Sequence, residues 1–322
     1  MALATAGVRV IDPILSNVAQ GYANMDLVGK FLFPVVPVFA SGGQIIEFGK
    51  EAFKLFNARR APGGSTRRIQ MGYLGKPFAL VQDSLEAIIP REHLRDASAV
   101  PGIDLASRAV MVTMKSLQLQ LEVDQAALAT TVANYTATSS SVTMTGATQW
   151  SNFSSGVSTA NPLADVDVGR EKIRSLTGIY PNTLLLSAKA FNAVKNNTFI
   201  IPRIQYSSNI QADASQITPN MLSGLFNVPN VIVGRAIYFN DANVTTDIWG
   251  GDAVLAYVPQ DSGDLQREEP SFGYTYTMDG NPIVEEAYFD NNNKSWAYGV
   301  NFERIPVLSG IAAGYLFKSA SA

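Results

Sequence analysis

Residues 104–133 of this 322-residue chain read DLASRAVMVTMKSLQLQLEVDQAALATTVA and carry the clearest helical signal in the sequence. Asp104 follows Pro101 and Gly102 and suits a helix N-cap, because its carboxylate accepts hydrogen bonds from the first free backbone N–H groups. A stripe of apolar residues recurs at spacings of four, three and four, namely Val110, Met114, Leu117 and Leu121. The pattern predicts a helix over about 104–133, roughly 43 Å long, whose stripe faces a core.

The segments before this helix favour extended backbone. Residues 1–43 are apolar without a sustained period, and Pro34 and Pro37 restrict the chain to extended conformations. We therefore expect an N-terminal arm that lies across another surface. Residues 44–80 form two extended runs around the turn-favouring sequence APGGS at 61–65, which indicates a long projecting hairpin.

The charges of the hairpin and of a later segment are opposite. Residues 44–80 hold seven Lys and Arg against two Glu, a net charge of +5, whereas 261–290 hold eight acidic residues against one Arg, a net charge of −7. Complementary charge would fix the register between neighbouring copies. The alternative is two solvated faces that never touch. The interface residues that this hypothesis assigns are Lys50, Lys54, Arg59, Arg60, Arg67, Arg68, Glu268, Glu269, Glu285 and Glu286.

The body of the chain alternates between helix and strand after an uncharged stretch at 125–164. From Ser271 onward the alternation is that of strands. The pattern is typical of an α+β fold with a β-rich end. The expected helices are 165–176, 188–195 and 219–226, and the expected strands are 183–186, 231–233 and 253–258.

The composition excludes several classes of function. Charged residues make up 16% of the chain, below the roughly one quarter that is usual, so its surface is suited to large protein contacts. A monomer covered by Ser, Thr, Asn and Gly is the alternative. A net charge of −3 is too balanced for binding nucleic acid by charge alone, and the absence of Cys excludes disulfides and thiolate sites. No apolar run is long enough to span a membrane and no signal peptide is recognisable, which indicates a soluble cytoplasmic protein.

Catalytic motifs are not found. The single histidine, His93, lies in PREHLRD and would pair with Glu92 or Asp96 as a general base, but the sequence offers no nucleophile beside it. A surface or helix-end histidine is the simpler interpretation. We predict that the chain is not an enzyme and uses no cofactor or metal. A soluble hydrolase or binding protein that uses His93 is the alternative from another class.

Several stretches carry a resemblance to a known family. They are DPILSN at 12–17, KFLFPVVPV at 30–38, TGATQWS at 145–151 with NPLAD at 161–165 and TGIYPNTLLL at 177–186, and PSFGYT at 270–275. With the order of arm, basic hairpin, long helix, α/β body and late strands, the chain resembles the major capsid proteins of tailed bacteriophages, which have the Hong Kong 97 capsid fold.

The resemblance implies a division of the chain and a function. It implies an N-terminal arm at 1–43, an extended loop at 44–80, a peripheral domain at 81–145 and 298–322 with the long helix as its spine, and an axial domain at 146–297. Copies would assemble into the hexamers and pentamers of an icosahedral shell that encloses double-stranded DNA. The protein would be located in the virion capsid, after assembly in the cytoplasm of the bacterial host.

The partners that the resemblance implies are other copies of the chain, a portal and, in some shells, cement proteins. A separate scaffolding protein is expected because the arm starts almost at Met1. The DNA would be packaged without sequence-specific contacts. The alternative with the same fold is an encapsulin, the shell protein of a bacterial nanocompartment.

Overall fold

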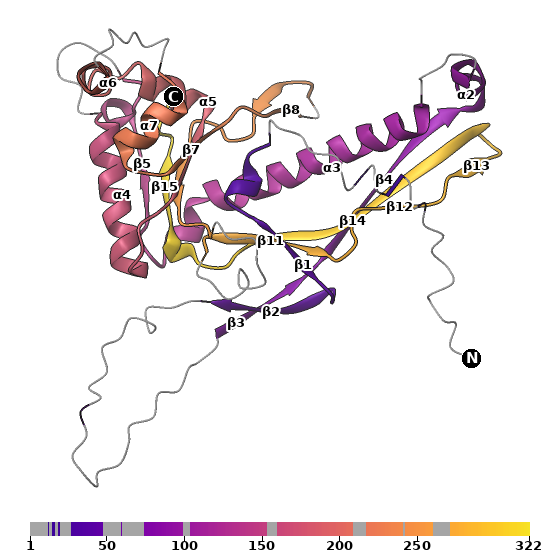
Figure 1. The fold of residues 1–322 in the computed structure, drawn as a ribbon, viewed down its shortest axis with the longest axis horizontal. Helices are drawn as coiled ribbons and strands as arrows, with labels where there is room; N and C mark the ends of the chain where they lie inside the picture. The colour runs from indigo at the N-terminus through magenta and orange to yellow at the C-terminus, as the bar shows by residue number, and fades with distance from the viewer. Residues whose placement is uncertain are drawn as a thin grey trace.

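The computed structural model describes residues 12, 15, 16, 19, 27–47, 59, 74–98, 104–152, 160–208, 217–240, 242–259 and 271–322. Helix α3, Leu105–Thr130, extends from a five-stranded sheet along the length of a six-stranded sheet (Figure 1). This helix and the two sheets organise the rest of the described chain.

Helix α3 begins where the sequence predicts. The Asp104 carboxylate accepts hydrogen bonds from Ala106 N at 3.0 Å and Ser107 N at 3.3 Å, which confirms the N-cap. The helix ends at Thr130, three residues before the predicted end, and Thr131 has extended backbone dihedrals. The chain then forms the short 3-10 helix η4, Val132–Tyr135. Along the predicted stripe Val110, Met114 and Leu117 are buried and Leu121 is half-buried.

The six-stranded sheet is built around the long strand β14, Ser295–Leu308. Val110 and Met114 of α3 pack on one face of this sheet, against Tyr298 and Val300. The other strands are β1 (Val35–Val38), β4 (Val81–Pro90), β11 (Gly273–Met278), β12 (Ile283–Val284) and β13 (Tyr288–Asp290). Strands β4, β11, β12 and β13 pair antiparallel with β14, β1 is parallel to β11, and helix α2, Arg91–Ser98, follows β4.

The five-stranded sheet is buried on both faces, as its almost continuously apolar strands require. Leu184 and Leu186 face one core, whereas Leu185 faces a second core with Trp249. The strand order is β5 (Ser141–Thr143), β15 (Gly314–Lys318), β10 (Ala253–Ala256), β6 (Thr183–Ser187) and β7 (Asn230–Gly234). Helices α4 (Pro162–Thr177), α5 (Ala188–Lys195) and α7 (Pro219–Phe226) contribute to the first core, and α6 (Ile201–Ser208) lies beside them (Figure 1).

Helix α4 begins at Pro162, three residues before the predicted start. Asn161 caps it by accepting a hydrogen bond from Ala164 N at 3.4 Å, and Pro162 suits the first helical position. Asp165 has a further contact, because Trp150 Nε1 donates to its Oδ2 at 2.8 Å. The predicted bounds of α5 and α7 are confirmed, and Ser187 caps α5.

The two sheets divide the chain differently from the expected domains. Within the expected peripheral range 298–322, β14 lies in the sheet that packs on α3, but β15 lies in the five-stranded sheet. Strands β11 to β13, within the expected axial range 146–297, pair with β14. Strand pairing, which brings together segments far apart in the chain, explains this difference.

Two pairs of strands lie outside the six-stranded and five-stranded sheets. Strand β2, Gly42–Glu47, pairs antiparallel with β3, Leu74–Ala79, so the two ends of the expected extended loop lie side by side. Residues 48–73 lie outside the described residues apart from Arg59. The second hairpin joins β8, Ile237–Phe239, to β9, Thr245–Asp247.

Glu122 of α3 connects the arm, the helix and the five-stranded sheet. Its buried carboxylate accepts hydrogen bonds from Val28 N at 3.1 Å, Gly29 N at 2.7 Å and Trp249 Nε1 at 2.7 Å. A Cβ at Gly29 would lie 1.9 Å from Gln125 Oε1, so this close approach requires glycine. Burial raises the pKa of Glu122 above its ordinary value, although the hydrogen bonds oppose the shift.

Glu122→Gln is expected to lower the free energy of unfolding by about 1–3 kcal/mol, because the amide NH₂ faces the Gly29 N–H. In the parent chain the folded state binds the Glu122 proton more tightly than the unfolded state. The free energy of unfolding therefore falls as pH rises from the ordinary pKa of 4.5 through the raised one, and the variant loses this component. Urea unfolding from pH 4 to pH 8 measures both effects.

Glu286→Gln, at an exposed position between β12 and β13, is the matched control and should leave the unfolding curves unchanged. An unaltered pH slope in Glu122→Gln would contradict the assignment of a raised pKa to Glu122.

Candidate subunit interface

Three of the ten predicted interface residues are described. Arg59 is exposed, Glu285 is half-buried, and Glu286 is exposed in the connection between β12 and β13. The other seven lie outside the described residues: Lys50, Lys54, Arg60, Arg67, Arg68, Glu268 and Glu269. The geometry of the acidic side of the predicted interface therefore depends on Glu285 and its neighbours.

Glu285 lies on the face of the six-stranded sheet that points away from α3. Its N–H donates to Gly299 O at 2.9 Å, and Asn301 Nδ2 donates to its Oε1. Side chains alternate along β14, and Tyr298 and Val300 pack with α3, so Gly299 and Asn301 belong to the opposite face.

Glu86 of β4 shares this face. Strand register places Glu86 directly opposite Gly299, and a Cβ at Gly299 would lie 3.7 Å from Glu86 Oε1 and 3.3 Å from Glu285 Oε2. The two carboxylates therefore converge over Gly299, where the missing side chain leaves space for both. We call Glu86 and Glu285 the acidic pair. Like charges this close favour the approach of a cation.

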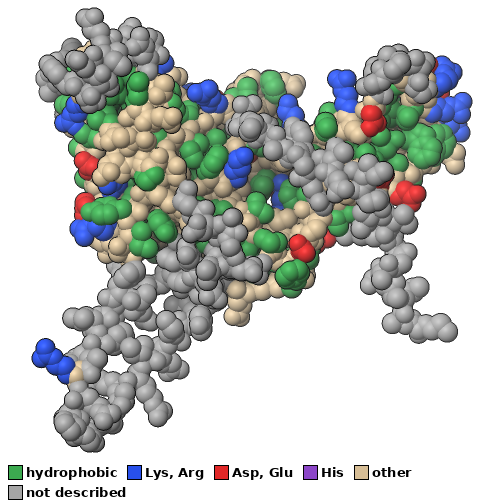
Figure 2. All heavy atoms as spheres, in the orientation of Figure 1, with side chains coloured by type: hydrophobic (Ala, Val, Ile, Leu, Met, Phe, Trp, Pro, Cys, Tyr) green, Lys and Arg blue, Asp and Glu red, His purple; other side chains and the backbone are tan. Residues whose placement is uncertain are grey.

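Exposed apolar and aromatic side chains adjoin the acidic pair. Tyr288 Oη donates to Glu86 Oε2 at 3.0 Å, and this hydrogen bond raises the pKa of Tyr288. Ile88, two residues along the strand from Glu86, is 57% exposed, and Tyr288 is 51% exposed. Figure 2 shows that apolar side chains are scattered over the visible surface and charged ones are few. Exposed apolar groups beside a few charges are typical of protein contact surfaces.

Sequence reasoning missed Glu86 because it is 199 residues from Glu285. The alternation of β4 would have placed Glu86 on one face of a strand, but the partner across that strand depends on the pairing of β4 with β14. Sequence alone does not specify that register.

His93 is exposed on α2. Among the described residues, no three His, Cys, Asp or Glu side chains gather as metal ligands would. None of the described helices combines the length and the apolar character that a membrane crossing requires.

Comparisons with known proteins give one consistent result. A model of the family described as phage major capsid protein E matches residues 111–309. The major capsid protein of Burkholderia phage BcepMu is 35% identical over 313 residues, which cover 96% of each chain. The crystal structure of a phage-related protein from Bordetella bronchiseptica is 43% identical, with a TM-score of 0.79 over 97% of this chain and 98% of that one.

A more distant structure shows the fold. The mature capsid of bacteriophage PhiM1 is 12% identical, with a TM-score of 0.55 over 92% of this chain and 88% of that one. The chain thus has the Hong Kong 97 type of phage capsid fold, as the sequence resemblance predicts.

Glu86→Gln is expected to lower the pKa of Tyr288, because the phenolic O–H then donates to a neutral amide oxygen. Titration of a carbon-13 label at tyrosine Cζ, followed by nuclear magnetic resonance, measures the change. Glu285→Gln is the matched control and should change the pKa of Tyr288 less, because Glu285 acts on it only through space. An equal change in both variants would contradict the hydrogen bond.

Proposed function

The chain belongs to the phage major capsid protein E family, and on this premise we propose that it is the structural subunit whose hexamers and pentamers build an icosahedral shell around double-stranded DNA. The observation that carries the proposal is the match to a phage major capsid protein over 96% of both chains. The sparse charge and the exposed apolar side chains beside the acidic pair suit a chain whose surface is covered by other copies.

We propose that the contact between copies uses the opposite charges. The basic residues of the 44–80 loop of one copy dock on the acidic pair of an adjacent copy, with Glu286, Glu268 and Glu269 contributing to the same negative region. A cation between Glu86 and Glu285 would relieve the repulsion between the two carboxylates. Complementary charge of this kind sets the register and speeds encounter more than it adds affinity.

We also propose that the two sheets belong to different domains. The six-stranded sheet with α3 forms the peripheral domain, and the five-stranded sheet with α4, α5 and α7 forms the axial domain that surrounds the symmetry axes. Each sheet has a hydrophobic core of its own, which supports this assignment, and a further core joins the end of α3 to the five-stranded sheet. The N-terminal arm contributes to both parts, since Leu15 packs beside α3 and Phe33 packs beneath the five-stranded sheet.

Further partners follow from this function. A scaffolding protein, a portal and, in some shells, cement proteins would act with the subunit in the cytoplasm of the bacterial host. A net charge of −3 gives the chain little general attraction to DNA, and the DNA would be packaged without sequence-specific contacts to it. The family match favours this function over the encapsulin alternative and over a hydrolase that uses His93.

Arg59→Glu combined with Arg60→Glu is expected to reduce the yield of particles, because reversed charges would meet the acidic pair. Adding Glu86→Lys and Glu285→Lys to the same chain should restore much of the yield, since each copy then carries both halves of a swapped pair. Sedimentation and electron microscopy of material assembled with the other phage proteins measure particle yield.

Arg108→Glu combined with Lys115→Glu, at exposed positions of α3, applies the same change in net charge elsewhere. Any loss of particle yield in this control should not be restored by Glu86→Lys and Glu285→Lys. Normal particle yield from the Arg59 and Arg60 variant would refute docking through these residues, and failure of the parent chain to form any particles would refute the proposed function.

A further inference from the structure

The six-stranded sheet protects two of its edges. Strand β1 forms one of them, and Val38 O accepts a hydrogen bond from Asp279 N, so Val38 faces β11 and Pro37 faces outward. Pro37 has no N–H that a further strand could use. At the edge formed by β12, the arm occupies the outward C=O of Val284, which accepts from Asp12 N at 3.1 Å. An edge strand without such protection recruits another strand.

Strand β4 forms the third edge, and its backbone groups alternate between the sheet and the outside. Glu285 N donates to Gly299 O, so Gly299 faces β12 and the next residue of β14, Val300, faces β4. Leu85 is the partner of Val300, and its backbone therefore faces β14. Every second residue of β4 directs its N–H and C=O away from the sheet, and these residues are Gln82, Ser84, Glu86 and Ile88.

This outward edge of β4 is unprotected. Its four outward residues are all exposed, and no hydrogen bond joins their backbone to any other residue that the structure describes. The strand contains no lysine, its register with β14 is unbroken, and its one proline is its last residue. A long edge of this kind accepts an extended segment by strand addition, in which main-chain hydrogen bonds supply affinity and alternate side chains supply specificity.

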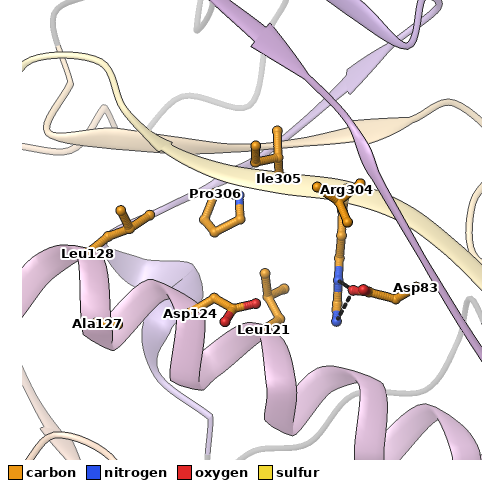
Figure 3. Close-up of a pocket in the computed structure, with 9 residues that line it drawn as sticks. Asp83, Leu121, Asp124, Ala127, Leu128, Arg304, Ile305 and Pro306 are labelled. Carbon is orange, nitrogen blue, oxygen red and sulfur yellow. Dashed lines mark hydrogen bonds and ion pairs between the residues drawn. The ribbon is translucent and has the colours of Figure 1, made fainter.

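The two faces of β4 differ in chemistry. Asp83 and Arg304 point into the pocket between β4 and α3 (Figure 3), so Val81 and Leu85, two residues to either side of Asp83, lie on the same face of the strand. Val81 is 53% exposed and Leu85 is 42% exposed. Glu86, a member of the acidic pair, lies on the other face. A segment that pairs with β4 therefore needs apolar side chains on the face toward α3 and a cation on the other.

Residues 50–56 of the basic loop, KEAFKLF, have this alternation. Successive side chains of an extended segment point to opposite faces. The cations then lie on one face and apolar residues on the other, with Lys50 and Lys54 on the first and Phe53 and Leu55 on the second. Phe56 shares the face of the cations, as the exposed Ile88 shares the face of Glu86 on β4. The segment therefore complements both faces of β4.

The charges select one direction for the added strand. Lys54 can lie opposite Glu86 in an antiparallel or in a parallel pairing. The parallel pairing would set Glu51 opposite Asp83, and like charges directly opposite each other are unfavourable. The antiparallel pairing avoids this contact.

The segment that pairs with β4 comes from a second copy, because the loop of the same chain is too short to reach back. Strand β3 leads into β4 through Leu80 alone, and the two strands follow one direction (Figure 1). Leu74, at the base of the loop, lies twelve residues before Glu86, which is about 40 Å of extended chain. Glu47 pairs with Leu74, and the seven residues from Glu47 to Lys54 span at most about 25 Å.

We propose that residues 50–56 of one copy add to the outward edge of β4 in an adjacent copy, as an antiparallel strand with Lys54 opposite Glu86. The inference rests on the proposed function, in which the loop docks by charge, and it supplies main-chain hydrogen bonds as the source of affinity. Charge complementarity alone sets register and encounter more than affinity. The docked segment is a seventh strand in the six-stranded sheet of its neighbour.

A disulfide tests this register. Leu55→Cys combined with Leu85→Cys places two thiols directly opposite each other in the proposed pairing, and they are the only thiols because the parent chain has no cysteine. The backbone of Leu85 faces β14, so the two residues form a non-hydrogen-bonded pair with Cα atoms about 4.5 Å apart, a distance that a disulfide bridges. Treating particles with oxidised glutathione should join copies into covalent multimers on a gel without reductant.

Lys54→Cys combined with Leu85→Cys is the matched control and should give few multimers, since its thiols point to opposite faces. Equal amounts of multimer from the two variants, or none from either, would overturn the proposal. Multimers from Leu85→Cys alone would show that two β4 edges pair with each other, and a disulfide within one chain would show that the loop reaches its own sheet; either result would also overturn it. Failure of the parent chain to form particles would instead refute the proposed function.

Ser84→Pro tests the main-chain hydrogen bonds, because it removes an outward N–H that the sheet of its own chain does not use. Ser84→Ala keeps that N–H and is the matched control. Both unassembled chains should unfold at the parent urea midpoint. The concentration at which Ser84→Pro forms particles should rise roughly two- to tenfold, as for one lost hydrogen bond at each contact. An unchanged concentration would overturn strand addition. If the midpoint of Ser84→Pro falls, Gln82→Pro with Gln82→Ala replaces the two variants.

Discussion

The buried carboxylate of Glu122 is the contact on which the arrangement of the subunit depends. Three donors from two distant segments converge on it, two from the backbone at the start of η2, Gly29–Phe31, and one from the indole of Trp249. A carboxylate at 2% exposure is unfavourable unless its lone pairs are satisfied, so the position of each donor is fixed by the others. Removing any one of them leaves a charge without full compensation.

Glu122 also relates the two sheets to each other. One helical turn further along α3, Gln125 donates to Thr275 of β11, and Thr275 in turn donates to Phe33 O in the arm. The polar groups that hold the arm thus come from the helix and from the six-stranded sheet, while Leu32 and Phe33 fill the core beneath the five-stranded sheet. Hydrophobic packing supplies most of the stability, and the polar contacts select one orientation of the parts.

The parts of this structure that could be predicted from sequence are those with local causes. Asp104 and Ser187 cap helices through hydrogen bonds to residues two or three positions away, and Thr218-Pro219 opens α7, so each signal lies within one turn. Only one member of the acidic pair could be predicted from sequence. Glu285 belongs to a charged segment, whereas Glu86 reaches it through a strand register that spans most of the chain. Similarly, β15 joins a sheet that its position in the sequence does not indicate.

Charges in this subunit are few, and those that are buried have specific partners. Lys318 Nζ lies 2.7 Å from Asp252 Oδ2, and the same carboxylate accepts from Ser319 N at 2.7 Å, so this pair is satisfied within the chain. Arg304 differs, because it donates to Asp83 and Leu117 while its buried Nη1 meets no hydrogen-bond acceptor among the described residues. Burying a cation with incomplete compensation is unfavourable for a subunit that functions alone. The guanidinium of Arg304 also lies over the ring of Phe302, with its Cζ 4.3 Å from the ring centroid, and this contact offsets part of the cost of burial.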